Sequence, residues 1–214
     1  MLYVLEFLFT FLLVFYTSDL GHSSIEIGLM IFSVFLFAYF VNTKTYANLT
    51  LCLSFFVTGY RPFIEVLVCL MVQVGGAFLA TLLLIATGYN LSIFETEDDM
   101  LAIICIELVC SFFITLVYYV LFASEKENPE VNGVFAVAAI YSAFTISFPH
   151  LPAGNFLKVL GGLNGDMNVV MGALIGQLVG SLGGGLLYKF LLCDKNSMKL
   201  KEIDLSNDDI NINF

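Results

Sequence analysis

Charged residues are scarce in this sequence, and basic residues are the scarcest of them. Arg61 is the single arginine, and with the lysines it makes 8 basic residues against 18 acidic ones. The net charge of −10 argues against nucleic acid as a partner, because nucleic-acid binding depends on lysine and arginine neutralising phosphates. It argues equally against a polybasic surface that binds anionic lipid headgroups.

Catalytic and cofactor-binding motifs are missing as well. We find no nucleophile–base set, no metal-ligand cluster and no glycine-rich phosphate loop, so we expect neither an enzyme nor a bound cofactor or metal. The spacings of the five cysteines fit no zinc or redox motif. We interpret them as small buried hydrophobic residues; they are Cys52, Cys69, Cys105, Cys110 and Cys193.

Hydrophobic residues, in contrast, make up 59% of the chain, and charged residues only 12%. A soluble domain carries about 45–50% apolar and about 25% charged residues, so lipid is the expected solvent. A spanning helix needs about 20 apolar residues, and the apolar runs predict six spans with two segments too short to cross. We expect the spans at about 1–17, 25–42, 62–88, 100–123, 132–148 and 168–192, and the short segments at about 47–57 and 152–160.

The basic residues that flank these spans predict the orientation of the chain, since they favour the cytoplasmic side. With a cytoplasmic N-terminus, Lys158 alone falls outside, so both termini should face the cytoplasm. We expect a multi-pass protein of the plasma membrane or of an internal membrane. The basic residues then predicted inside are Lys44, Arg61, Lys126, Lys189, Lys195, Lys199 and Lys201.

An internal repeat relates the two halves of the chain. Glu107 follows Glu6 by 101 residues, and Gln177 follows Gln73 by 104 residues, each in a similar apolar context. Because three spans per half is an odd number, the halves must lie in opposite orientation, as in many transport proteins. We expect one channel domain over 1–193, with repeat one at about 1–95 and repeat two at about 100–193, followed by an acidic, disordered cytoplasmic tail over 194–214.

Two glutamates lie inside apolar runs, where an ionisable group costs about 2.5–3.5 kcal/mol at mid-helix. Glu6 and Glu107 are either proton or cation sites, or structural carboxylates that accept hydrogen bonds from the backbone of the short segments. We favour the structural role, and we expect Gln73 and Gln177 to form interhelical hydrogen bonds. Small residues four apart should let the third and sixth spans approach their neighbours closely; they are Gly76 with Ala80, and Gly176 with Gly180.

Several segments in this order resemble the aquaporin, or major intrinsic protein, family. EFLFTFLLVF resembles its first helix, and RPFIEVLVCLMVQVGGAFLATLLL resembles its third. CIELVCSFFITLV is similar to the fourth helix, and GQLVGSLGGGLLYKFLL to the sixth, so the resemblance covers about residues 3–192. It implies an all-α membrane protein with six transmembrane helices, two re-entrant half-helices and an inverted repeat. It also implies a homotetramer in the lipid bilayer, with one pore in each subunit.

The family's two Asn-Pro-Ala signatures are altered here. Alignment places the first on Tyr46-Ala47-Asn48 and the second, 105 residues later, on Leu151-Pro152-Ala153. The resemblance implies that the signature asparagines donate hydrogen bonds to water at the pore centre. Tyr46 has only its hydroxyl for this and Leu151 has no donor, while Asn48 and Asn155 are possible substitutes.

The resemblance also implies a selectivity filter at the outer constriction. By spacing, it falls near Ile27, Ala139, Phe148 and Gly154, and Gly154 occupies the position of the family's arginine. This mostly apolar set predicts either a wider pore for glycerol-like solutes or a channel that hardly conducts.

Three hypotheses follow for the function. The first is a passive channel for water or small neutral solutes such as glycerol. The second is a non-conducting aquaporin-like structural membrane protein. The third, ranked last, is a proton-coupled carrier that uses Glu6 or Glu107.

Overall fold

The structure is a computed structural model, and every regular element in its described residues is helical. The described residues are 2–17, 23–40, 48–59, 61–88, 99–122, 129–148, 151–152, 154–155 and 167–192. Tyr46, Ala47, Ala153, most of the expected second short segment and the expected tail lie outside them. The helices are α1 (Leu2–Thr17), α2 (Ser24–Phe40), α3 (Leu49–Thr58), α4 (Phe63–Ala86), α5 (Met100–Phe122), α6 (Pro129–Ser147) and α8 (Met167–Leu187), which continues as η1 (Tyr188–Leu192).

The ends of these helices follow local sequence signals. At the start of α2, the Ser23 amide donates to Glu26 Oε2 at 2.7 Å, and the Glu26 amide donates to Ser23 Oγ at 3.3 Å, a reciprocal capping box. Pro62 directly precedes α4, where its missing N–H costs nothing. The short helix α3 ends at Gly59, whose φ of 75° suits glycine and whose amide closes the last turn. These signals explain why the helices lie within a few residues of the expected ranges.

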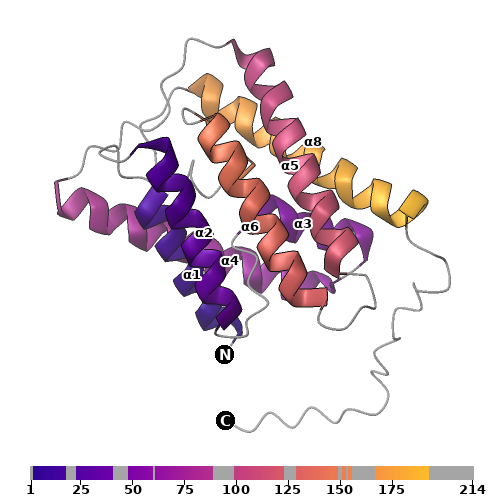
Figure 1. The fold of residues 1–214 in the computed structure, drawn as a ribbon, viewed down its shortest axis with the longest axis horizontal. Helices are drawn as coiled ribbons and strands as arrows, with labels where there is room; N and C mark the ends of the chain where they lie inside the picture. The colour runs from indigo at the N-terminus through magenta and orange to yellow at the C-terminus, as the bar shows by residue number, and fades with distance from the viewer. Residues whose placement is uncertain are drawn as a thin grey trace, which may run out of the picture.

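The helices pack as two similar sets of three. Helix α1 packs on α4 and α2 in the first set, and α5 packs on α8 and α6 in the second. The two sets meet where α2 packs on α6, and α3 from the first set lies against α8 of the second (Figure 1). The pairings within one set match those within the other, which is the arrangement of an inverted repeat.

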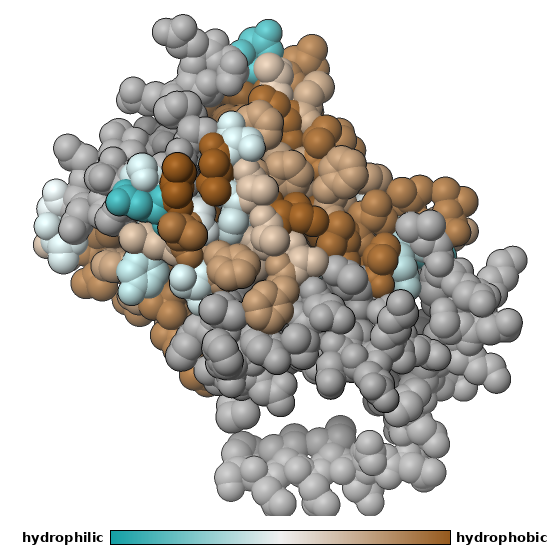
Figure 2. Space-filling view, viewed as in Figure 1, coloured by the Kyte–Doolittle hydropathy of each residue, from teal (hydrophilic) through white to brown (hydrophobic). Residues whose placement is uncertain are grey.

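On α4 and α8, small and polar residues occupy much of the buried face, while large apolar residues occupy the exposed face. Helix α4 exposes Ile64, Met71 and Phe78, and it buries Gln73 and Ala77. Helix α8 follows the same rule, since glycine, alanine, serine and glutamine fill its buried face. Figure 2 shows hydrophobic residues over much of the coloured surface, on the side where α5 and α8 lie. This inverted distribution fits a protein whose solvent is lipid.

Close approach at glycines explains the small-residue pairs. A Cβ at Gly76 would lie 2.6 Å from the Phe7 carbonyl oxygen of α1. A Cβ at Gly176 would lie 2.5 Å from the Ile104 carbonyl oxygen of α5. The expected close packing of the third and sixth spans is therefore confirmed.

Three of the described helices are long and apolar enough to cross a membrane. They are Phe63–Ala86, Met100–Val120 and Met167–Leu191. The apolar parts of α1, α2, α3 and α6 among the described residues are shorter, at 10–17 residues. Of these, α3 corresponds to the first short segment, which was expected not to cross.

Candidate functional site

The N-terminus of the half-helix α3 lies inside the protein, where its free N–H groups need partners. Asn48 satisfies one of them as the N-cap: its Oδ1 accepts a hydrogen bond from the Leu51 amide at 3.2 Å, and it also accepts one from the Thr50 hydroxyl at 3.0 Å. Asn48 is buried, and its backbone is extended, as an N-cap requires. The asparagine at the third position of the first predicted motif therefore caps the N-terminus of the half-helix.

The same side chain joins the two repeats. Asn48 Nδ2 donates a hydrogen bond to the Gly154 carbonyl oxygen at 2.9 Å, across 106 residues of sequence. One amide hydrogen of Asn48 is used in this bond, which leaves the other for a further acceptor. Gly154 follows Leu151 and Pro152 of the second predicted motif, so the two motifs meet at this junction.

A buried carboxylate holds the other side of Gly154. Glu107 Oε2 accepts hydrogen bonds from the Gly154 amide at 2.7 Å and from Gln177 Nε2 at 2.7 Å. Glu107 and Gln177 are both fully buried, on α5 and α8. These bonds are the ones that a structural role of Glu107 requires, since a buried carboxylate is stable only with donors around it.

Helix α8 also supports the end of α3. Ser181 Oγ donates to Thr50 Oγ1 at 2.9 Å, and the Thr50 hydroxyl in turn donates to Asn48. A continuous hydrogen-bonded chain therefore runs from Ser181 through Thr50 and Asn48 to Gly154 and Glu107. It fixes the positions of both motif segments relative to the frame of helices, as buried polar networks do when every member is paired.

The second motif is apolar around this junction. Leu151 is 2% exposed and packs in a cluster with Leu84, Ile103 and Val169. Phe148, at the end of α6, packs against the same cluster. Asn155 is buried beside Tyr141 of α6. The buried Asn155 directly follows Gly154, the residue whose carbonyl oxygen accepts from Asn48.

The four expected filter positions do not share one cluster. Phe148 packs near Leu151, whereas Ile27 of α2 packs against the larger core cluster, and Ala139 is exposed on α6. Gly154 has a φ of 85°, and a Cβ there would lie 2.7 Å from Ile114 Cδ1 and 3.3 Å from the Ser111 amide nitrogen of α5. An arginine at this position would therefore start toward α5.

The buried carboxylate of the first repeat has a different environment. Gln73 Nε2 donates to Glu6, and also to Cys52 Sγ at 3.3 Å and to Cys69 Sγ at 3.6 Å. Both glutamine–glutamate pairs therefore link a third or sixth span to a first or fourth span. Among the described residues, Gln177 Nε2 donates to Glu107 and to no thiol.

Sequence reasoning missed the bond between Asn48 and Gly154 and the contact of Ser181 with Thr50. Ser181 and Thr50 are polar residues in apolar runs, a signal that was present. Their partners depend on the packing of α3 against α8, which no spacing rule gives.

The helix pairing, the inverted repeat and the half-helix whose N-terminus lies inside the protein define an aquaporin-like membrane fold. No family model matches the sequence, and no curated protein matches it. Among solved structures, an aquaglyceroporin from Plasmodium falciparum is similar, with a TM-score of 0.69 and 19% sequence identity. The similarity covers 90% of this chain and 96% of that chain, so the aquaporin-like fold extends over nearly all of both.

Proposed function

We propose that this protein is a passive transmembrane channel for small neutral solutes such as glycerol, and for water. The hydrogen bond between Asn48 and the Gly154 carbonyl oxygen is the observation that carries the proposal, because it joins the two motif segments inside an aquaporin-like frame. The similarity to an aquaglyceroporin supports the same solute class.

The chemistry of the junction favours neutral solutes. The N-terminus of α3 carries a partial positive charge of about half a unit, which repels cations at the point where the segments meet. Asn48 has a second amide hydrogen that is suited to donate to a solute hydroxyl or to water. Phe148 is half-buried against the apolar cluster of Leu151, and its remaining surface suits the carbon backbone of a polyol.

The surroundings of Leu151 favour one alternative, a non-conducting structural protein. Leu151 is 2% exposed within its apolar cluster, and the first position of the second motif offers no hydrogen-bond donor there. A chain of this kind would keep the fold and serve as a membrane scaffold.

Proteoliposome shrinkage distinguishes these functions. Purified protein is reconstituted, and light scattering is followed by stopped flow after a step in sorbitol and then after a step in glycerol. We expect faster water efflux than in empty liposomes, and faster reswelling in glycerol. Permeability equal to that of empty liposomes for both solutes would exclude the channel and favour the structural protein.

A second pair of measurements separates a channel from a proton-coupled carrier. Glycerol flux through a channel should rise in proportion to concentration and should not respond to a pH gradient. Saturable, gradient-driven uptake that disappears in a folded Glu6→Gln variant would instead establish the carrier.

The assembly and topology belong to the same proposal. We expect a homotetramer in the bilayer with both termini cytoplasmic. Native mass spectrometry from detergent should give four chains per particle, and a protease added to sealed, inside-out vesicles should remove the segment after Asp194. Monomers, or protection of that segment, would contradict the assembly or the topology respectively.

A further inference from the structure

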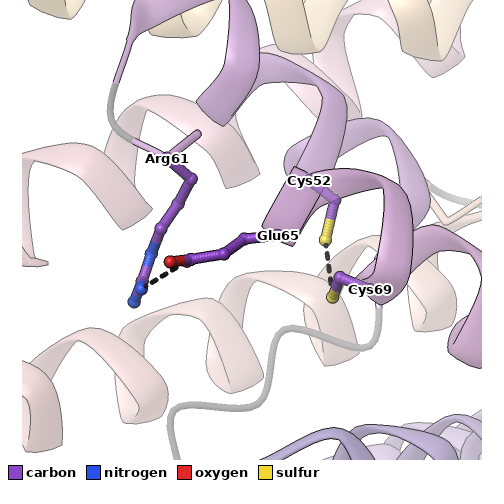
Figure 3. Close-up of polar contacts among 4 residues, drawn as sticks. All are labelled: Cys52, Arg61, Glu65 and Cys69. Carbon is purple, nitrogen blue, oxygen red and sulfur yellow. Dashed lines mark hydrogen bonds and ion pairs between the residues drawn. The ribbon is translucent and has the colours of Figure 1, made fainter. Parts of the chain in front are cut away.

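A buried cluster of two thiols and a carboxylate lies where α1, α3 and α4 meet. Cys52 Sγ on α3 and Cys69 Sγ on α4 are 3.4 Å apart, and Figure 3 shows the two thiols facing each other. These two sulfur atoms and a carboxylate oxygen of Glu6 all lie within 4.8 Å of one another. Glu6 and Cys52 are each 1% exposed. The three residues are far apart in sequence, so only the fold brings them together.

The cluster converges on the amide group of Gln73. Its Nε2 donates to all three members, to Glu6, to Cys52 at 3.3 Å and to Cys69 at 3.6 Å. The carboxylate oxygen and the two sulfur atoms therefore all face the same positively polarised group, the amide NH₂ of Gln73. Gln73 is fully buried, and its Oε1 has no hydrogen-bond partner among the described residues. Rotation of this amide by half a turn would bring an oxygen toward the cluster.

The second repeat has the same glutamine–glutamate pair without a thiol at the position that corresponds to Cys69. There Gln177 donates to Glu107 in the equivalent interhelical pair. The residue equivalent to Cys69, by the offset of 104 residues that relates the glutamines, is Ala173. The first repeat therefore carries a cysteine at a position where the second repeat has alanine.

A small cavity adjoins the cluster. It has a volume of about 30 Å³ and is lined by Glu6, Cys52 and Cys69. Tyr3, Arg61 and Glu65 line it toward the N-terminal end of α4. This is room for one or two water-sized groups. Arg61 Nη1 and Glu65 Oε2 form an ion pair at 3.0 Å, and both side chains are partly exposed, so the cavity leads from the polar end of α4 toward the thiols.

We propose that Cys52, Cys69 and Glu6 form a binding site for a thiophilic divalent cation of the zinc class. Thiolates and carboxylates are the ligands of such ions, and three protein ligands leave a fourth position for water or for Gln73 Oε1. A tetrahedral ion at about 2.3 Å from each sulfur holds two sulfurs about 3.8 Å apart. The observed 3.4 Å therefore needs an adjustment of a few tenths of an ångström.

Binding has a defined charge balance. The ion replaces two thiol protons, which leave for the solvent, and the two thiolates and one carboxylate then surround a charge of +2. The remaining negative charge lies in the cavity that Arg61 also lines. The ion would link α1, α3 and α4 near the N-terminus of α3, the end that Asn48 caps. The site does not depend on whether the channel conducts.

Cadmium absorption and zinc competition test this site on the full chain in detergent. The protein is reduced with a phosphine, stripped with a chelator, and titrated with Cd²⁺ while the sulfur-to-cadmium absorption is recorded. Zn²⁺ affinity is measured by competition with a chromophoric chelator. We expect one ion per chain and a higher thermal midpoint with the ion bound. Cys52→Ser and Cys69→Ser should each weaken binding at least tenfold and remove the thermal shift.

Cys105→Ser is the matched control, because Cys105 is an exposed thiol on α5. It should bind as the wild type does. If Cys52→Ser fails to fold, Cys69→Ser decides alone, since Cys69 is only partly buried. Binding that persists in a folded Cys69→Ser variant, or that falls equally in Cys105→Ser, overturns the proposal. So does a reduced wild-type protein that takes up no ion.

Discussion

Replacement of Asn48 is the sharpest test of the junction, because this side chain has two separable roles. Its Oδ1 caps α3 through the Leu51 amide, and its Nδ2 reaches the Gly154 carbonyl oxygen. Asn48→Ala removes both interactions. Asn48→Ser keeps a hydroxyl that caps a helix about as well as asparagine, but it is too short to reach Gly154.

The free energies of unfolding of the two variants should differ by the contribution of the N-cap. Loss of an N-cap costs about 1 kcal/mol. Loss of the buried bond to Gly154 costs about 1–2 kcal/mol, because a carbonyl group is left without its partner. We therefore expect Asn48→Ala to lower the free energy of unfolding by about 2–3 kcal/mol and Asn48→Ser by about 1–2 kcal/mol. For a chain of this size, the alanine variant should melt about 5–10 °C lower.

Thermal unfolding followed by circular dichroism in detergent measures these shifts, and proteoliposome permeability is recorded in parallel. Ser33→Ala is the control: Ser33 is exposed on α2, and its hydroxyl donates to the Leu29 carbonyl oxygen of its own helix, at 2.8 Å. It should shift stability by no more than about 0.5 kcal/mol. An Asn48→Ala protein as stable as the wild type would refute the junction, and equal losses in the alanine and serine variants would refute the capping role.

Three further predictions address the same frame. Gly154→Ala should destabilise the protein by about 2–4 kcal/mol, because the φ of 85° at this position disfavours a Cβ and the Cβ would also contact α5. A melting curve that matches the wild type would contradict the observed backbone. Gly176→Val should separate α8 from α5 and lower the yield of folded protein in detergent, whereas Gly183→Val, which meets only the edge of the Phe112 ring, should be tolerated better. Glu107→Leu should lower the free energy of unfolding by about 3 kcal/mol or more, because the Gly154 amide and Gln177 Nε2 lose their acceptor. Glu107→Gln keeps one acceptor oxygen and should lower it less. Chemical denaturation measures both losses, and a reversed order would contradict a structural role.

The helices were predictable from sequence because apolar runs and their polar breaks are local signals. The expected ranges of α1, α4 and α5 agree with the structure to within a few residues, and Asn48 and Pro62 lie at the starts of α3 and α4 as caps do. The similarity in structure confirms the aquaporin-like fold that the residues suggested. Domain limits, orientation and the roles of the filter positions remain predictions.

The site was harder to predict because its contacts depend on tertiary packing. Alignment assigned Asn48 to the third position of a motif, and nothing in its neighbours indicated a bond to a carbonyl 106 residues away. The cysteines were interpreted as ordinary buried residues because metal motifs are recognised by spacing. Cys52 and Cys69 lie on different helices, so their proximity appears only when α3 packs against α4.

The altered signatures change what each repeat contributes to the junction. Repeat one contributes a side chain, since Asn48 both caps α3 and crosses to the other segment. Repeat two contributes backbone, since Gly154 offers its carbonyl oxygen to Asn48 and its amide to Glu107. A backbone contact places no demand on the identity of the neighbouring side chain, so the apolar Leu151 is compatible with an intact junction. Of the side chains at the two motifs, Asn48 is therefore the one on which this junction depends.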